Sequence, residues 1–327
     1  MTAIPMPADF PATEPPALVC LGLSAFDMTW VVEKLAPGGK ARAHSHHEGG
    51  GGMAATAAVA AARLGARTQF WGRAGDDMAG RAMRDELASQ GVDVTHFRLF
   101  GQARSSVSGI VVDAQGERTI VNFRGEGLPD DPSWLPLGGV PACDAVLADP
   151  RWPEGAAALF TQARAHGVPT VLDGDVADSW IFDVLLPLTD FAVFSEPGLA
   201  GYAHSPDPAG TARGAPDGDA AIAAALAHAR GRGCRVAAVT LGDRGVAWDA
   251  GAGMRRLPAF SVRAVDTTGA GDVFHGALAF ALGLRWSIED AFRFSAAVAA
   301  CKCLHPGGRA GTPDLATAWA FLHRSKE

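Results

Sequence analysis

Hydrophobic positions in the first part of the chain alternate between short buried runs and exposed stretches. Ala17–Leu23 is apolar and closes at Gly22, which predicts a buried β-strand. Residues 30–48 instead mix small residues, polar residues and histidines around a Pro-Gly-Gly turn, a pattern that favours exposed antiparallel strands or a flap. The alanine-rich segment from Met53 to Leu64 predicts a buried helix, with Gly65 as its C-terminal cap.

The following segments predict a strand, a helix and then a hairpin. Thr68–Gly72 favours a strand and residues 78–90 favour a helix. Val107–Val112 and Arg118–Phe123 both show strand-like alternation, and the turn Asp113–Gly116 joins them. Two such runs around a short polar turn are typical of a β-hairpin.

After Gly125 the pattern changes to a regular alternation of strands and helices. Strands are predicted at Ala145–Asp149, Pro169–Asp173, Phe191–Phe194 and Val236–Thr240, with helices at 154–166 and 220–230. This alternation is typical of a doubly wound, mostly parallel sheet with helices on both faces. We therefore expect one α/β domain over residues 18–327, in which about 28–50 and 100–125 form a small β-sheet lid.

Two segments have the composition of irregular chain. Residues 1–17 contain five prolines and lack the basic start and apolar centre of a signal peptide, so they predict a disordered leader. Residues 202–219 are rich in Pro, Gly, Asp and Ala and predict a surface insertion.

Composition narrows the function classes. A formal net charge of −7 argues against an electrostatic nucleic-acid binder, and no charge-free apolar stretch is long enough to span a membrane. The five cysteines are scattered and odd in number, which favours a reducing compartment and a cytoplasmic location. Only four of the 28 basic residues are lysines, so a lysine inside a functional segment stands out.

The motif with the clearest chemistry is Asp-Thr-Thr-Gly-Ala-Gly-Asp at residues 266–272, directly before an apolar helix. Gly269 and Gly271 allow a tight turn whose N–H groups, with that of Ala270, would face an anion together with the helix N-terminus. Such an anion hole suits a phosphoryl group in transfer, and Asp272 could accept the proton of an attacking hydroxyl. Taken alone, the motif could equally be a glycine turn in which Asp272 only caps the helix.

Three further segments accompany this motif in the chain: Gly49–Gly65, Gly72–Asp77 and Thr240–Gly245. Together the four segments resemble the signatures of the ribokinase-like (PfkB-type) carbohydrate kinases, over about residues 18–320. The resemblance implies an α/β sandwich with a β lid that pairs in a homodimer. It also implies an enzyme that transfers a phosphoryl group from ATP to a small-molecule sugar.

The resemblance also assigns roles to individual residues. Asp272 matches the catalytic base, and Gly269, Ala270 and Gly271 match the anion hole. Asp27 matches the carboxylate that binds sugar hydroxyls, while Gly51 and Gly52 match the glycines that let the sugar approach a helix. The nucleotide-binding turn corresponds to Thr240, Gly242 and Gly245.

The chain departs from the family pattern at two places. Thr56 stands where an asparagine commonly touches the sugar. The usual Asn-x-x-Glu motif near magnesium appears as Ser195–Gly198, in which Glu196 is the remaining candidate metal ligand. Mg²⁺ is still expected because the ATP phosphates need a cation. The backbone of Asp266 and Thr268 resembles the loop that binds a monovalent cation in some members.

Several other stretches resemble the members of this family that phosphorylate the 1-hydroxyl of 6-deoxy-6-sulfofructose in sulfoglycolysis. They are Gly50–Val59, Val146–Trp152, Val171–Asp175, Phe194–Leu199, and Lys302 with Pro306–Gly311. A sulfonate carries one fixed negative charge and is recognised by cations and neutral donors that converge on its oxygens. Lys40, Asn122 and Arg151 match the positions expected for this task, although each alone could be a solvated or turn residue.

Other readings of the sequence stay open. Fructose, fructose 6-phosphate, ribose or a keto-deoxy-sugar acid could replace the sulfosugar, and a catalytically silent sugar sensor is a more distant alternative. The histidines in His44–Glu48 could serve a lid or dimer contact, bind a metal or touch the substrate. We expect His275 to pack on its helix and Arg309 to stabilise a loop near the nucleotide, while Asp173 and Asp175 either order magnesium-bound water or cap a helix.

Overall fold

The computed structural model describes residues 14–35, 38–115, 117–203 and 218–324. Most of the predicted leader and most of the predicted 202–219 insertion lie outside these ranges. No helix within the described ranges has the length and hydropathy needed to cross a bilayer.

The described residues form a nine-stranded main sheet with the order β13-β12-β11-β10-β9-β8-β1-β4-β5. Its strands are β1 (Ala17–Gly22), β4 (Arg67–Gly75), β5 (Phe97–Phe100), β8 (Ala145–Ala148), β9 (Thr170–Gly174), β10 (Phe191–Ser195), β11 (Val236–Thr240), β12 (Val246–Asp249) and β13 (Met254–Leu257). Neighbouring strands from β5 to β11 are parallel, and β12 and β13 extend the sheet in antiparallel fashion. The carboxyl ends of the parallel strands therefore lie along one edge, where ligands bind in open α/β sheets.

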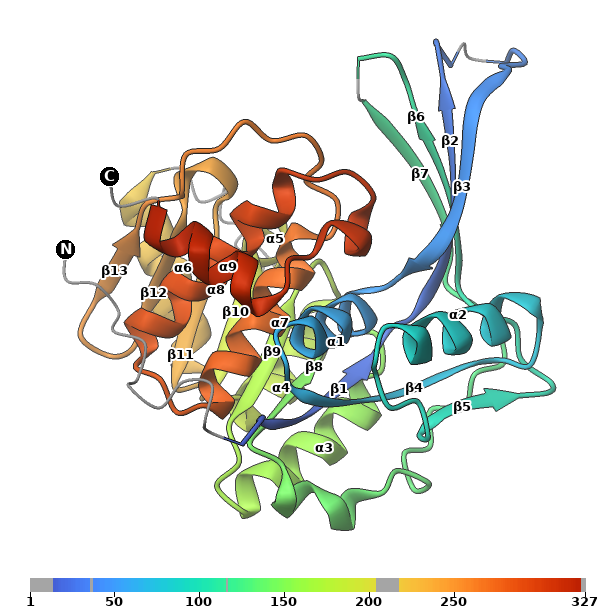
Figure 1. Cartoon of the computed structure of the whole chain (residues 1–327). Helices are drawn as coiled ribbons and strands as arrows, with labels where there is room; N and C mark the ends of the chain where they lie inside the picture. The colour runs from blue at the N-terminus through green and yellow to red at the C-terminus, as the bar shows by residue number, and fades with distance from the viewer. Residues whose placement is uncertain (1–13, 36–37, 116, 204–217, 325–327) are drawn as a thin grey trace, which may run out of the picture.

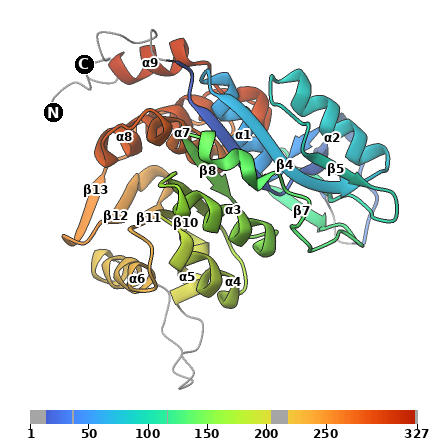
Figure 2. The ribbon, with the colours of Figure 1, turned by 90° about the horizontal axis from the view of Figure 1, so that it is seen from below.

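Helices cover both faces of this sheet (Figure 2). One face carries α1 (Met53–Arg63), α2 (Met78–Ser89), α7 (Ala270–Gly283), α8 (Ile288–Cys303) and α9 (Leu315–Arg324). The other carries α3 (Pro153–Ala165), α4 (Ser179–Leu185), α5 (Glu196–Ala203) and α6 (Asp219–Gly231). Each face buries its own apolar cluster against the sheet, which confirms the expected doubly wound α/β fold.

A second, four-stranded sheet projects from the main body (Figure 1). Its strands are β2 (Ala25–Val32), β3 (Ala43–Gly51), β6 (Val107–Val112) and β7 (Arg118–Phe123), in the order β3-β2-β6-β7. Two antiparallel hairpins join side by side, and the inner strands β2 and β6 run parallel. The predicted hairpin is thus present with its predicted bounds, and it pairs with the exposed strands predicted upstream.

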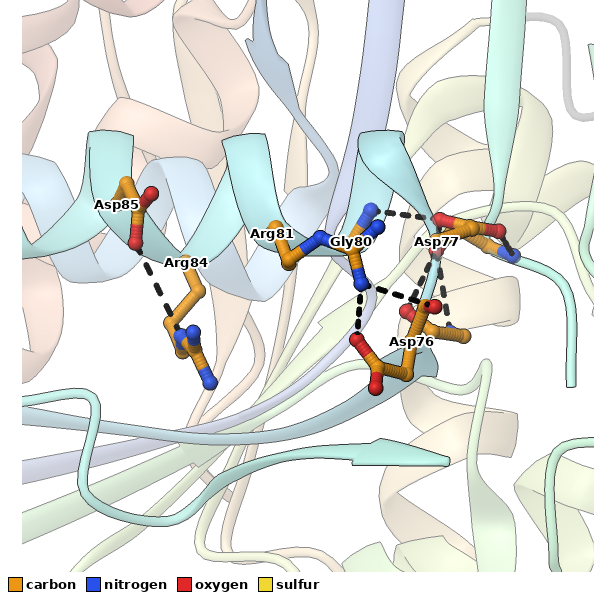
Figure 3. Close-up of polar contacts among 8 residues, drawn as sticks. Asp76, Asp77, Gly80, Arg81, Arg84 and Asp85 are labelled. Carbon is orange, nitrogen blue, oxygen red and sulfur yellow. Dashed lines mark hydrogen bonds and ion pairs between the residues drawn. The ribbon is translucent and has the colours of Figure 1, made fainter. Parts of the chain in front are cut away.

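Asp77 connects the main body to this second sheet. Its carboxylate caps α2 by accepting a hydrogen bond of 2.8 Å from the N–H of Gly80 (Figure 3). The same carboxylate accepts hydrogen bonds from the hydroxyl and the N–H of Ser105, at 2.6 and 2.9 Å. Ser105 precedes β6, so the cap of a main-body helix also holds the chain where it enters the second sheet.

Candidate active site

The turn before α7 has the geometry that the glycine motif predicts. Gly269 is the N-cap of α7 and has a left-handed backbone, with φ of 72°, a conformation that glycine adopts without steric cost. Most of α7 beyond its first turn is buried, which fixes the direction of its N-terminus. The first-turn N–H groups and the helix dipole therefore point at one spot and can bind an anion there.

Asp272 lies in this first turn with its side chain only partly exposed. Burial and then the nearby carboxylate of Asp173 raise the pKa of Asp272 to about 8, although His275 acts in the opposite direction. A carboxylate with such a raised pKa is a strong enough base to take a proton from a hydroxyl that attacks a phosphoryl group.

His275 is buried one turn further along α7, as expected. Its Nδ1 lies 2.7 Å from the carbonyl oxygen of Gly271, and its Nε2 lies 2.9 Å from that of Val193. The ring therefore joins the anion-binding turn to β10. Asp173 lies 3.4 Å from the same Nδ1, and burial raises the pKa of its carboxyl well above the ordinary value.

Asp27 and the glycines at the end of β3, which are expected to meet the sugar, lie side by side and form what we call the substrate side. A Cβ on Gly51 would collide with the Asp27 carboxylate, so the two residues need the glycine to lie this close. Gly52 has φ of 93° and caps α1, and a Cβ there would collide with the backbone of Leu23 and Ser24. Burial raises the pKa of Asp27, while Ser108 and Arg309 lower it.

A row of polar side chains crosses the second sheet beside this site. In the strand register, Asp27 faces Ser108 on β6, and Ser108 faces Asn122 on β7. The Nδ2 of Asn122 donates to the Ser108 hydroxyl at 3.1 Å, and the neighbouring Ser108 side chain lowers the pKa of Asp27. The structure thus brings Asp27 and Asn122 together through Ser108. Sequence reasoning missed Ser108, because a serine within an alternating strand does not stand out.

Thr56 links the two halves of the site. It is buried on α1, and a Cβ added at Gly269 would touch its methyl group at 3.4 Å and lie 3.7 Å from an Asp272 oxygen. Thr56 therefore lies between the α1 N-terminus, which follows Gly51 and Gly52, and the anion-binding turn.

Arg151 lies just beyond the carboxyl end of β8. Its guanidinium donates to the carbonyl oxygen of Val176 at 2.8 Å and to the Asp175 carboxylate at 3.1 Å, and its side chain is 18% exposed. These contacts fix the guanidinium at the ligand-binding edge of the main sheet while leaving part of it accessible.

Asp149, which the sequence reasoning did not single out, organises this edge. Its buried carboxylate accepts hydrogen bonds from the N–H groups of Leu23, Ala54 and Arg151, at 2.7, 3.1 and 2.9 Å. It therefore ties the end of β1, the start of α1 and the Arg151 loop together. Its place as an acidic residue directly after an apolar strand is the sequence feature that could have indicated this role.

Lys40 lies apart from the other substrate-side residues. It is exposed in the turn between β2 and β3, beyond the Val32–Ala43 pair, whereas Asp27 lies near the other end of β2. At about 3.3 Å per strand residue, most of the length of β2 separates them. Within one chain, the strand register therefore keeps Lys40 away from Asn122, which lies level with Asp27 on β7.

Arg309 occupies a different place from the one expected. It lies in the short 3₁₀ helix Gly308–Gly311, but its guanidinium donates to the carbonyl oxygen of Gly51 at 2.5 Å and to Glu86 at 2.6 Å. Arg309 therefore supports the glycines on the substrate side, and the expectation that it serves a loop near the nucleotide is wrong.

A cavity of about 540 Å³ opens on the other side of the anion-binding turn. Thr240, Gly242 and Gly245 line it together with Ala270 and Gly271, so the predicted nucleotide turn and anion hole meet in one cavity. Its remaining wall is largely apolar and includes Phe260, Val262, Phe274, Ala296 and Ala299. Gly245 has φ of 89°, and a Cβ there would collide with the backbone of Leu257. An apolar slot beside an anion hole can hold a base and ribose next to their phosphates.

The candidate metal ligand has another partner. Glu196 begins α5 and accepts a hydrogen bond of 2.5 Å from Arg244. Across the described ranges, no group of three or more His, Cys, Asp or Glu side chains is arranged to hold a metal ion. In the His44–Glu48 segment, His46 stacks on Trp30 with 5.1 Å between ring centroids, which is a packing role.

Comparisons with known proteins show the family of this chain. Residues 16–315 match the pfkB family carbohydrate kinases. The ribokinase of Haemophilus influenzae is 30% identical over 273 residues, which cover 82% of this chain and 85% of that protein. The fructokinase of Klebsiella pneumoniae is 32% identical over 236 residues, covering 66% and 71% of the two chains.

The fold has a close counterpart among solved structures. The Arabidopsis thaliana ribokinase, solved with ribose and ATP, superposes with a TM-score of 0.82 over 94% of this chain and 99% of that chain, at 24% identity. The family match covers most of the chain, and the anion-binding turn borders the cavity that Thr240, Gly242 and Gly245 also line. The chain belongs to the pfkB family of carbohydrate kinases and is an ATP-dependent sugar kinase.

Proposed function

We propose that this kinase phosphorylates the 1-hydroxyl of 6-deoxy-6-sulfofructose to give its 1-phosphate. The observation that carries the proposal is Arg151, a partly exposed guanidinium held at the carboxyl end of β8 by Asp175 and the Val176 carbonyl. A guanidinium fixed in this way offers its remaining donors to the oxygens of a sulfonate. Asn122 on the second sheet would add a neutral donor by releasing one of its two present acceptors, the Val107 carbonyl or the Ser108 hydroxyl.

The catalytic roles follow from the same arrangement. Asp27 binds sugar hydroxyls over Gly51 and Gly52, and Thr56 lines the path to the anion-binding turn. Asp272 takes the proton of the attacking hydroxyl, and the N–H groups of Gly269, Ala270 and Gly271 stabilise the charge on the transferred phosphoryl group. Thr240, Gly242 and Gly245 hold the nucleotide.

Magnesium enters this proposal with the nucleotide. The described residues supply no protein cage for a metal ion, so the ATP phosphates provide most of the ligands. Asp173 has a buried carboxylate oxygen without a hydrogen-bond partner, and together with Asp175 it fits a role facing the water shell of such an ion. Mg²⁺ would supply positive charge to the phosphates.

We also propose that the second sheet acts as a lid and pairs in a homodimer. Ile120 and Val121 on the edge strand β7 are 58% and 71% exposed, so this edge has apolar side chains that a second copy could cover. Lys40, at the far end of this sheet, would contact a sugar only across such a pair. Light scattering coupled to size exclusion tests the pairing, and a monomer at working concentration would exclude it.

The alternative substrate is a neutral sugar such as ribose or fructose. The names of the two relatives favour it, since they are a ribokinase and a fructokinase. In that case Arg151 only braces the β8 loop against Asp175.

ADP release measured side by side with sulfofructose, fructose 6-phosphate, fructose and ribose decides between these substrates. We expect the highest kcat/KM with sulfofructose, and a loss of at least about tenfold for this sugar in Arg151→Met, because a charge-assisted contact is removed. The matched control is Arg164→Met, which removes an exposed arginine on α3. Equal or better efficiency with a neutral sugar or with the phosphate sugar in the native enzyme would exclude the sulfosugar assignment.

A further inference from the structure

A fully buried lysine lies beneath the anion-binding turn. Lys302, near the end of α8, is one of only four lysines in the chain. Its side chain has no exposed surface, which is rare for lysine. Its ammonium donates a hydrogen bond of 2.8 Å to the carbonyl oxygen of Asp266 and lies 3.7 Å from the Asp266 carboxylate. A buried ammonium must have such partners, because its desolvation is otherwise unfavourable.

Asp266 also binds the backbone of two loop segments. Its carboxylate accepts hydrogen bonds from the N–H groups of Thr268 at 2.8 Å, Gly307 at 2.9 Å and Gly308 at 3.2 Å. Burial alone would raise the pKa of Asp266. The pKa nevertheless lies well below its usual range, because the carboxylate is stabilised by hydrogen bonds from Thr268 and Gly308 and by the charge of Lys302. One ion pair therefore fixes the segment that leads into Gly269 and the loop that follows α8.

The position of the ammonium matters for the chemistry of the turn. Asp266 lies three residues before Gly269, and the N–H groups of Val265 and Asp266 both donate to the Cys303 carbonyl, next to Lys302. A positive charge bound to this backbone favours the negative charge that the turn receives during phosphoryl transfer.

The same backbone was expected, from the family resemblance, to bind a monovalent cation. The residues present do not fit that expectation, because the Lys302 ammonium already contacts both the carbonyl and the carboxylate of Asp266. A metal cation bound to the carbonyl and carboxylate of Asp266 would lie next to the Lys302 ammonium. The two positive charges would repel each other strongly, because buried charges are poorly screened by solvent and salt.

We propose that the Lys302 ammonium is the built-in cation of the anion-binding turn, and that this kinase therefore needs no monovalent metal ion. Lys302 acts as a positioning residue through Asp266 and does not touch the reacting atoms. The inference rests on the kinase activity and holds for whichever sugar is the substrate.

A cation titration of the native enzyme tests this directly, with any sugar that supports ADP release. In a buffer whose only monovalent cation is tetramethylammonium, we expect turnover within about twofold of that in potassium chloride of equal ionic strength. A several-fold activation by potassium, sodium or ammonium ions would overturn the proposal.

Replacement of Lys302 provides a second test of the proposal. Lys302→Met should lose at least about tenfold in turnover in tetramethylammonium buffer, and potassium or ammonium ions should restore part of it. In thermal unfolding without sugar, these ions should raise the Tm of Lys302→Met but not that of the native protein or of Arg164→Met. If Lys302→Met does not fold, Lys302→Gln keeps a donor for the Asp266 carbonyl without the charge and serves the same comparison.

Failure of the Lys302 proposal can be distinguished from failure of the proposed substrate. A variant that stays inactive and gains no thermal stability with any cation would show that Lys302 acts only as a core residue, and would overturn the proposal. Failure of sulfofructose as a substrate leaves the cation titration and the thermal arm unaffected.

Discussion

The backbone carbonyl of Gly51 accepts a hydrogen bond of 2.5 Å from Arg309, which follows 258 residues later in the chain. The guanidinium also pairs with Glu86 on α2 and is almost completely buried. The end of β3 is therefore held by the C-terminal loop that carries Arg309 and by a helix of the main body, and we call these contacts the Arg309 brace.

Removing this brace should destabilise the protein. Arg309→Met leaves the partly buried Glu86 and the Gly51 carbonyl without their partner, so we expect a loss of about 3 kcal/mol in the free energy of unfolding. Arg81→Met breaks an exposed pair with Asp76 (Figure 3) and should change it by less than about 1 kcal/mol. Urea unfolding of both variants measures the difference, and equal effects would argue against the brace.

Asp272→Asn should reduce turnover by about 10²–10⁴-fold, because the amide cannot take the proton of the attacking hydroxyl. ATP affinity, measured by calorimetry, should change little, since the backbone of the turn is retained. Turnover close to that of the native enzyme would exclude Asp272 as the base.

The raised pKa of Asp272 predicts the pH dependence of the reaction. The base must be deprotonated, so kcat/KM should rise with pH through about 8 in the free enzyme. Asp173→Asn removes the carboxylate that contributes most after burial, so the rising limb should move to lower pH. Asp85→Asn, an exposed carboxylate on α2, should leave the limb in place.

The same pKa predicts that the active site lowers stability. A carboxyl whose pKa is raised from 3.8 to about 8 by folding favours the native state below pH 4, and this contribution is lost as pH rises through 8. The ligand-free Asp272→Asn variant should therefore unfold at a higher Tm than the native protein, with a gap that widens between pH 4 and 8. A gap that is constant over this range would contradict the pKa assignment.

Gly51 and Gly49 offer a matched pair on β3. A Cβ at Gly51 collides with the Asp27 carboxylate, whereas a Cβ at Gly49 meets no atom within 4 Å. Gly51→Ala should raise the KM for the sugar at least about tenfold, because it displaces the Asp27 carboxylate, which we propose binds the sugar hydroxyls, and should leave the KM for ATP unchanged. Gly49→Ala should behave like the native enzyme, and a shared effect on both substrates would point to a general disturbance of β3.

Local patterns were sufficient for much of the fold. The hairpin Val107–Phe123 was predictable because both strands alternate around a polar turn, and α2 was predictable from its periodicity. The short strands β12 and β13 and the helix α4 were not predicted. Met254–Leu257 contains two adjacent arginines, and α4 has only seven residues, so neither gives a clear periodic signal.

For the candidate site, the sequence predicted the residues of the glycine motifs but few of the contacts between distant segments. Asp149 binds N–H groups 126 and 95 residues away, and Arg309 reaches Glu86 across 223 residues. Such pairings depend on the tertiary packing of whole elements, which periodicity and spacing do not specify. Lys40 was grouped with Arg151 by resemblance, whereas the strand register separates it from the site.

The parallel junction between β2 and β6 has a consequence for how such an enzyme can diversify. The residues proposed to bind the sugar come largely from two hairpins on either side of this junction, while those proposed for phosphoryl transfer lie at the start of α7 in the main body. Slippage of one hairpin by a single residue would turn Ser108 and Asn122 to the opposite face of the sheet. Changes within the hairpins can thus alter substrate choice in small evolutionary steps while the machinery for phosphoryl transfer is inherited unchanged.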